Sequence, residues 1–530
     1  MNRPVVTAPH AGLFTRFYPR PHAIITLGLA LLTLLTRVPF QSQILHHWDS
    51  VNFAYGLVQF DVASGQPHVP GYILYVLLGQ VVNTLIGDHQ TTLVLISMVS
   101  SALAVAMLYL LGRDMFGHWT GLVAAVLLAS SPLFWFYGEI ALPHTLDTFM
   151  ITLSAWFLYR LMRGEHHRVW LTAVILGVLG GLRPQSLLFM GPLVLLAGRH
   201  LSLRRAVGGI VVLGLTCLAW FLPLIGSTGG LDRYLAIMRD FTANFNTTTS
   251  IFSGAGAFGL VRNLRKLTMY TLYGWAAGLL PAVLFVFYRT KKGRLGALVR
   301  SERAWFLAVW AAPTVPYYLL IHMGQQGLVF VYLPVLLLVS AEGLCRLIGA
   351  TSRRALAGAI GALAITNTVI FLLMPTYPLG PDNLKLLTQQ TLREQDAYFG
   401  ERFDVITAEF PSPHTVVVAA NWRHVQYYLP DYAWVPYDLG AAWEINAGQP
   451  IPDLPARELS VATSGATPDA DGQVTLILFD PELLAFLRDA DDSVRSHSLP
   501  SGDALYSLII HEEQAVRLAP EGITLVTRDG

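Results

Sequence analysis

The stretch GYILYVLLGQVVNTLI, residues 71–86, decides how the chain folds across a membrane, because counting it as a span inverts the orientation of every later helix. Hydrophobic residues make up 53% of the 530 residues and charged residues only 13%, against roughly 25% charged residues in soluble proteins. This composition excludes a single-anchor enzyme, a secreted disulfide scaffold and a disordered chain. The sequence predicts an α-helical polytopic membrane protein.

Eleven further apolar blocks have lengths that suit helices crossing a hydrocarbon core of about 30 Å. The two blocks on either side of Gly181-Leu182-Arg183-Pro184 are short for full crossings. We expect the spans at residues 22–40, 91–111, 119–137, 146–162, 168–182, 185–198, 205–225, 266–288, 303–321, 327–345 and 354–374.

Arginine and lysine in the loops decide the role of residues 71–86, because cytoplasmic loops are enriched in these residues. If 71–86 does not cross, five basic loops fall on the side of the basic N-terminus; if it crosses, nearly all of them fall outside. We therefore expect 71–86 to lie as a helix along the outer interface, within an outer loop of residues 41–90. The protein is then a cell-membrane protein with a cytoplasmic N-terminus that carries Arg3, Arg16 and Arg20. The five basic loops are those of Arg113, Arg160–Arg168, Arg199–Arg205, Arg289–Arg303 and Arg346–Arg354.

The composition changes after Met374, where a proline-rich break follows. We expect a transmembrane domain over residues 1–374 and a soluble domain over residues 375–530, placed outside the cell by the same count of crossings. Two β-branched runs, 415–420 and 474–479, are each followed by turn-like or helix-like residues. This pattern indicates a small extracytoplasmic α/β domain.

The outer loop contains HHWDSVNF at residues 46–53 and HVPGYILY at residues 68–75. Asp49 follows a membrane helix closely and lies beside an aromatic residue and two histidines. A carboxylate at this depth can take a proton from a hydroxyl nucleophile as a general base, where a lipid-borne substrate meets a hydrophilic acceptor. The alternative is that Asp49 only caps a helix at the membrane surface, with Trp48 in the interfacial aromatic belt.

These two runs resemble the first outer loop of the GT-C membrane glycosyltransferases, in the branch that reads W-D-S-G-E followed by H-P-P-G-x-P-L-Y and includes protein O-mannosyltransferase-like proteins. The resemblance implies inverting transfer of a mannose-like hexose or a pentose from a polyprenyl-phosphate donor to an extracytoplasmic acceptor, with Asp49 as the general base. The chain departs from the pattern at Asn52, where the branch has Glu, and at Val69, where it has Pro. Either Asp49 works without the second acid, or Asp61 substitutes for it, or the reaction differs.

Other side chains at the outer helix ends are candidates for binding the donor phosphate or sugar. Arg183 has a planar fork that suits a phosphate, and the alternatives are that it reaches the interface or pairs with Glu139 or Asp147. His322 and Gln325 lie in the turn HMGQQG, which can hydrogen-bond phosphate or sugar or simply face water.

Glu139, His68 and Asp61 complete the set of substrate-binding candidates, and the loop of Glu139 resembles the E-x-x-x-L loop of the same family. No outer loop contains a D-x-D motif, and we expect no metal ligands among the site residues and no certain cofactor. The alternative that the protein uses a divalent cation stays open, and its ligands would come from His46, His47, Asp49 and His144.

The predicted function is that of a GT-C-type hexosyltransferase or mannosyltransferase. Its partners are the lipid bilayer, a polyprenyl-phosphate sugar and a glycan, lipid or protein acceptor. The formal net charge of +1 provides no field that would attract nucleic acid. A transporter or flippase of a lipid-linked or small polar substrate is the alternative, and it would need polar groups throughout the depth of the bundle. A membrane scaffold or sensor that works through its tail is a third interpretation.

Overall fold

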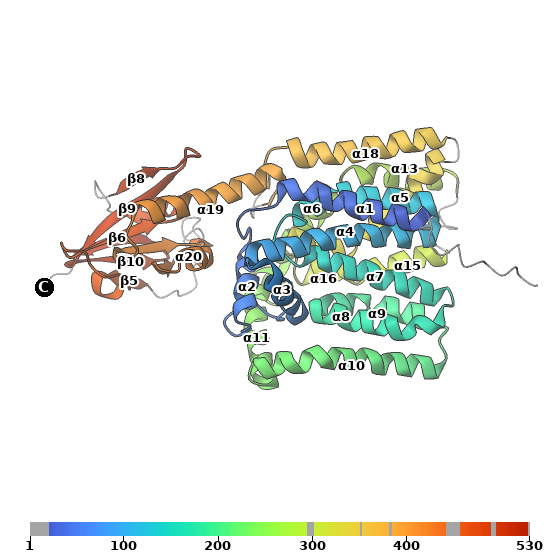
Figure 1. The fold of residues 1–530 in the computed structure, drawn as a ribbon, viewed down its shortest axis with the longest axis horizontal. Coiled ribbons are helices and arrows are strands. Elements are labelled where there is room, and N and C mark those ends of the chain that lie inside the picture. The colour runs from blue at the N-terminus through green and yellow to red at the C-terminus, as the bar shows by residue number, and fades with distance from the viewer. Residues whose placement is uncertain are drawn as a thin grey trace, which may run out of the picture.

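The computed structural model describes residues 21–293, 301–349, 352–380, 384–440, 456–488 and 494–527. A long helical bundle carries a smaller domain at one of its ends (Figure 1). The N-terminal residues Arg3, Arg16 and Arg20 lie outside the described residues. The expected fold class, a polytopic helical domain followed by a domain that contains β-sheets, is confirmed.

The eleven expected apolar blocks are mostly helical, but block 119–137 divides into two helices at Ser131 and block 303–321 divides after Ala311. Lipid offers no partners to backbone polar groups, so an apolar segment satisfies them within its own helix. Pro184 begins a new helix, because its fixed φ suits the first helical position and its missing N–H needs no partner there. The bundle consists of α1 (Pro21–Arg37), α4 (His89–Phe116), α5 (His118–Ser130), α6 (Pro132–Tyr137), α7 (His144–Met162), α8 (Val169–Leu182), α9 (Pro184–Gly198), α10 (Leu203–Ser227), α12 (Gly256–Trp275), α13 (Leu279–Lys291), α15 (Glu302–Ala311), α16 (Thr314–Leu320), α17 (Leu333–Leu344) and α18 (Arg353–Leu373).

Within the described residues, five helical segments are each long and apolar enough to cross a membrane by themselves. Several shorter apolar helices lie between them in the chain. The protein is therefore a multi-pass membrane protein. The five long segments are His22–Phe40, His89–Phe116, Leu203–Ser227, Gly256–Lys291 and Arg353–Leu373.

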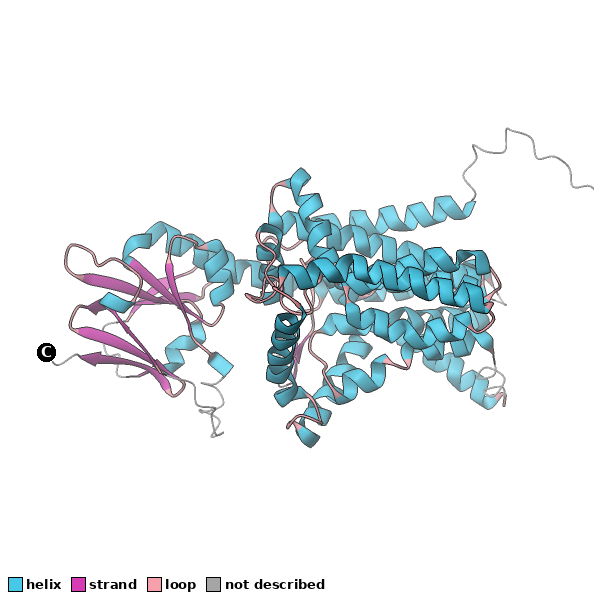
Figure 2. Cartoon of the chain, turned by 90° about the horizontal axis from the view of Figure 1, so that it is seen from below, coloured by secondary structure: helices cyan, strands magenta, loops and turns pink. Residues whose placement is uncertain are grey.

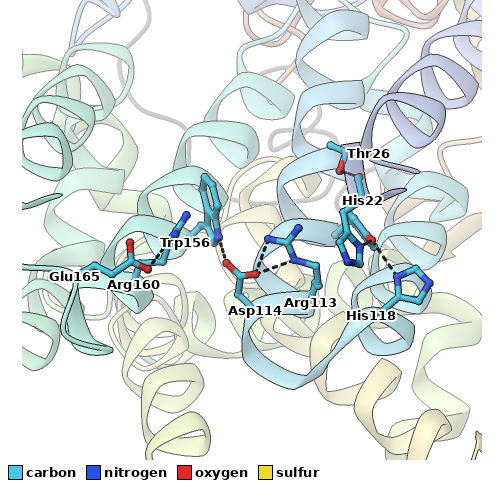
Figure 3. Close-up of polar contacts among 9 residues, drawn as sticks. His22, Thr26, Arg113, Asp114, His118, Trp156, Arg160 and Glu165 are labelled. Carbon is cyan, nitrogen blue, oxygen red and sulfur yellow. Dashed lines mark hydrogen bonds and ion pairs between the residues drawn. The ribbon is translucent and has the colours of Figure 1, made fainter. Parts of the chain in front are cut away.

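Basic turns lie together at the end of the bundle away from the smaller domain. His22, at the start of α1, contacts the Tyr109 hydroxyl near the end of α4 through Nδ1 at 3.0 Å. Arg113 forms an ion pair with Asp114, and Arg160 is ion-paired at the end of α7 (Figure 3). The grouping agrees with the distribution of loop charges, and the cytoplasmic location of this end stays a prediction.

The opposite end of the bundle, next to the C-terminal domain, holds the outer loop (Figure 1). Gln80 donates through Nε2 to the carbonyl oxygen of Gly56 at 3.4 Å, and Thr92, in the first turn of α4, donates to Asn83 at 3.0 Å. Residues 73–86 thus begin and end at the same end of the bundle. Three helices gather here: α2 (Trp48–Val58), α3 (Ile73–Ile86) and α11 (Leu231–Thr249).

The C-terminal domain contains two sheets (Figure 2). The first is mixed, with the strand order β4-β3-β6-β9-β8, and β3 is parallel to both β4 and β6. The second has the order β5-β10-β11-β7. The strands of the first sheet are β3 (Thr415–Ala419), β4 (Ala433–Pro436), β6 (Gln473–Leu478), β8 (Arg495–Ser498) and β9 (Ala504–His511), and those of the second are β5 (Arg457–Ser460), β7 (Leu487–Arg488), β10 (Gln514–Ala519) and β11 (Gly522–Thr527).

Helices and a short β-ladder complete this domain: α19 (Gln389–Glu409), α20 (Trp422–Tyr428), β1 (Pro378–Gly380) and β2 (Leu384–Lys385). The β-branched run in β3 is buried on both faces, with Val416 and Val418 in one apolar cluster and Val417 in another. Burial on both faces is characteristic of a strand with parallel neighbours, and it explains why the run is continuous instead of alternating.

Candidate active site

Asp49 lies in the first turn of α2, and His47 is the N-cap residue of that helix. The His47 Nδ1 atom accepts the backbone N–H of Asp49 at 3.0 Å and thereby caps the helix. Placement at a helix N-terminus favours a carboxylate, because unpaired N–H groups point towards it. The capping role expected as the alternative thus falls to His47, which leaves the Asp49 side chain available for other contacts.

Side chains from three separate parts of the chain surround the Asp49 carboxylate. His68 Nδ1 lies 3.4 Å from Oδ1, and His47 Nδ1 lies 3.5 Å from Oδ2. Gln325 donates from Nε2 to Oδ2 at 2.5 Å, and its Oε1 accepts from His144 Nε2 at 2.7 Å. The Asp49 side chain keeps 21% of its surface exposed, so an entering substrate can reach it.

The charges around Asp49 favour its ionised form. Burial by itself raises the pKa of the carboxyl, but His68, His47 and the Gln325 amide together hold the pKa below its ordinary value. Burial lowers the pKa of His68, against the opposing effect of Asp49. At neutral pH the site therefore combines a carboxylate with a neutral imidazole, and the carboxylate is free to accept a proton.

Arg183 lies at the break between α8 and α9, where its backbone is extended. Its Nη1 atom forms an ion pair with Asp147 Oδ2 at 3.1 Å, and the Ser186 hydroxyl donates to the same oxygen at 2.9 Å. The pairing with Asp147, expected as an alternative, is therefore present. Among the described residues, Arg183 Nε and Asp147 Oδ1 are buried without a hydrogen-bond partner. Such groups are costly to bury unless a ligand completes them.

The turn after α16 brings His322 and Gln325 to this end of the bundle. His322 contacts Thr249 through Nδ1 at 3.3 Å, whereas Gln325 hydrogen-bonds the Asp49 carboxylate. Arg262 of α12 donates to the carbonyl oxygen of Met323 at 3.5 Å and adds a cation beside the turn.

The surroundings of Asp61 and Glu139 differ from those of Asp49. Asp61 accepts from Ser64 Oγ at 2.5 Å and from the Ala63 N–H at 3.0 Å, which closes a local turn. Glu139 is fully buried, and neither of its carboxylate oxygens has a hydrogen-bond partner in the described part of the chain. The contacts that surround the Asp49 carboxylate come from His47, His68 and Gln325, and the roles of Asp61 and Glu139 stay predictions.

Sequence reasoning missed the connection from Asp49 through Gln325 to His144. Residues 49, 144 and 325 are far apart in the chain, and no spacing rule joins them. The described residues contain no group of three or more His, Cys, Asp or Glu side chains arranged to hold a metal ion. The four candidate ligands for a divalent cation do not form such a group: His46, His47, Asp49 and His144.

The chain is similar to known proteins in part of its sequence and in its overall fold. A family model described as dolichyl-phosphate-mannose-protein mannosyltransferase matches residues 68–226. The crystal structure of ArnT from Cupriavidus metallidurans bound to undecaprenyl phosphate superimposes with a TM-score of 0.57 at 12% sequence identity, over 92% of this chain and 97% of that chain. The chain therefore shares the fold of that ArnT.

The apo form of the same ArnT also has this fold. It gives a TM-score of 0.52 at 13% identity, over 92% of this chain and 97% of that chain. An oligosaccharyltransferase from Archaeoglobus fulgidus gives 0.47 at 14% identity, over 80% of this chain and 65% of that chain. No curated protein sequence matches the chain significantly. The family-model match begins at His68 and includes Arg183, whereas Asp49 and the turn at 322–325 lie outside it.

Proposed function

We propose that this chain transfers a sugar, a mannose-like hexose or a pentose, from a polyprenyl-phosphate donor to an extracytoplasmic acceptor, with inversion and with Asp49 as the general base. The observation that carries the proposal is a partly exposed Asp49 carboxyl group held between His47, His68 and Gln325. The ArnT from Cupriavidus metallidurans, which has the same fold, is bound to undecaprenyl phosphate in its crystal structure, and this supports a donor of that lipid class.

In the proposed reaction Asp49 removes the proton of an acceptor hydroxyl while the hydroxyl oxygen attacks the anomeric carbon of the sugar. The bond from that carbon to the phosphate oxygen breaks, and polyprenyl phosphate leaves with the electron pair. Attack on the face opposite the phosphate inverts the configuration. The proton on Asp49 then passes to water, which the exposed part of the side chain can contact.

We assign binding of the phosphate and sugar to the remaining polar side chains at this end of the bundle. Arg183 is suited to the phosphate, since its Nε, which has no partner among the described residues, is a donor with a fixed direction. His322 and Gln325 can donate to phosphate or sugar oxygens from the turn beside α12. His68 would orient Asp49, while the substrate contacts proposed for Glu139 and Asp61 rest on the family resemblance alone.

The direct test is turnover of radiolabelled polyprenyl-phosphate mannose and polyprenyl-phosphate pentose by the full-length protein in lipid nanodiscs. Asp49→Asn preserves the size of the side chain and removes the base, so we expect turnover to fall by roughly 10²- to 10⁴-fold. Asp404→Asn, on the exposed side of α19, serves as the matched control and should retain turnover. Asp61→Asn distinguishes the two acids of the outer loop.

Each outcome decides between interpretations. Full activity of Asp49→Asn together with loss of activity in Asp61→Asn would transfer the role of base to Asp61. No turnover of either donor by the wild-type protein would refute the proposed reaction and favour a flippase or a scaffold.

A further inference from the structure

The C-terminal domain is docked on the loop that precedes Asp49. Asp396 of α19 accepts from the Ser42 hydroxyl at 2.8 Å, from the Gln43 N–H at 2.9 Å and from the Ile44 N–H at 3.2 Å. The next residue, Leu45, donates its N–H to the Tyr428 hydroxyl at 2.9 Å, and its carbonyl oxygen contacts His424 Nε2 at 2.8 Å. Five hydrogen bonds to residues 42–45 therefore join this domain to the start of α2.

The edge of the sheet that faces α2 is the one at which α/β domains usually bind ligands. Strand β3 runs parallel to β4 and β6, and α20 follows the carboxyl end of β3. Ligands of open α/β sheets bind outside the carboxyl ends of parallel strands. Figure 1 shows α20 on the side of the domain that faces α2, and Arg423 of α20 donates to the carbonyl oxygen of Ser64 in the outer loop at 2.7 Å.

Three indole rings meet where α20 approaches α2. The Trp48 and Trp422 ring centroids are 5.0 Å apart with the planes at 86°, and those of Trp422 and Trp434 are 4.9 Å apart with the planes at 7°. We call these three residues the tryptophan cluster. Each of them keeps part of its surface exposed, and Trp48 is the immediate neighbour of Asp49 in the chain.

The surroundings of the tryptophan cluster combine apolar ring faces with hydrogen-bonding groups. The Arg423 guanidinium lies 4.9 Å from the Trp422 ring centroid, and its Nη1 donates to Gln426 at 2.9 Å. His47, at the start of α2, has 40% of its side chain exposed. A pyranose ring has an apolar C–H face and a rim of hydroxyl groups, and it matches both features.

We propose that the tryptophan cluster is a binding site for a saccharide acceptor, which the C-terminal domain presents to Asp49. This assignment rests on the proposed function, because it identifies the acceptor class of that reaction. A lipid chain would find too little apolar surface among these partly exposed rings and polar groups. Peptide binding is an outcome that the test below distinguishes.

Saturation-transfer difference NMR on the full-length protein in nanodiscs tests the site without donor and without turnover. The probes are mannotetraose, chitotetraose and cellotetraose, with sorbitol as a polyol that lacks a ring face and a short peptide containing serine and threonine as the peptide acceptor. We expect saturable transfer to the ring C–H protons of at least one tetrasaccharide and none to sorbitol. Affinity for that saccharide should fall roughly tenfold or more in Trp434→Leu and in Trp48→Leu.

Trp305→Leu is the matched control, since Trp305 is 55% exposed on α15, outside the tryptophan cluster, and should bind the saccharide as the wild type does. Trp422→Phe keeps an aromatic ring at the centre of the cluster, so it tests the site in a variant that should still fold. We expect this variant to lose part of its affinity for the saccharide. Binding of none of the saccharides, equal binding by Trp434→Leu, or binding only of a peptide acceptor would overturn the assignment. Failure of the proposed reaction is read separately, from donor turnover by the wild-type protein.

Discussion

Asp396→Asn tests whether the C-terminal domain holds the loop in front of Asp49. In the wild type Asp396 Oδ1 accepts from Ser42 and Ile44, and Oδ2 accepts from Gln43. Asparagine has the same shape but only one acceptor oxygen. At least one of the three donors therefore faces an N–H group in the variant, and the remaining bonds lose the charge of their acceptor.

The expected loss follows from these three bonds. A hydrogen bond to a charged acceptor contributes about 1.5–3 kcal/mol, and a neutral one about 0.5–1.5 kcal/mol. Burial raises the pKa of Asp396, so desolvation offsets part of the gain from its charge. We expect the docking of residues 42–45 to weaken by about 1–3 kcal/mol, which increases opening of the loop roughly 5- to 150-fold.

Hydrogen exchange followed by mass spectrometry measures this opening in the full-length protein. Amides in residues 42–50 should exchange faster in Asp396→Asn, and donor turnover should fall with them, because the loop determines where α2 begins. Asp404→Asn, on the exposed side of the same helix, provides the matched control. Equal protection of residues 42–50 in the two variants would refute the docking role of Asp396.

Three further variants test the site. Arg183→Lys keeps the charge beside Asp147 but loses Nε, so the KM for the donor should rise roughly tenfold with little change in thermal stability; an unchanged KM would remove Arg183 from the phosphate site. In acid, the protonated His68 lowers the pKa of Asp49, against the effect of burial. His68→Gln removes this positive charge, so the pKa of Asp49 should rise and the acid limb of the kcat/KM profile should move to higher pH. An unchanged acid limb would contradict the pairing of His68 with Asp49. Gly327→Ala would place a Cβ atom 2.7 Å from the His144 ring, and we expect a loss of about 1–3 kcal/mol in stability together with lower turnover; wild-type thermal unfolding and turnover would show that the turn adjusts freely.

Much of the membrane domain could be predicted from the sequence, because lipid imposes simple rules. Apolar length alone located the helical blocks, since a backbone in lipid must satisfy its own polar groups. The distribution of arginine predicted that the five basic loops lie on the same side of the membrane as the N-terminus. The structure places Arg113 and the start of α1 at the same end of the bundle. The short pair around Pro184 also agrees with the observed break between α8 and α9.

The contacts within the site could not be predicted, because they join residues that no local pattern relates. Gln325 reaches Asp49 only after the turn following α16 packs against α7, and the His144 ring then lies close to Gly327. The docking of α20 on residues 42–45 joins parts of the chain that are almost 400 residues apart. The sequence motif singled out Asp49, whereas its contact with Gln325 results from tertiary packing.

Asn52 supports the proposal that Asp49 acts as the base without a second acid. It lies one helical turn after Asp49, at the position where the resembling branch has a second acid, and its side chain is buried. A glutamate there would place a like charge close to Asp49 and would raise the pKa of both groups. With asparagine in its place, two histidines and the Gln325 amide surround Asp49, and its pKa stays below the ordinary value. A base of this kind is intrinsically weaker but remains ionised well into acid. Such a base suits a reaction in which polyprenyl phosphate is already a good leaving group, because proton removal from the acceptor then needs to proceed only partway in the transition state.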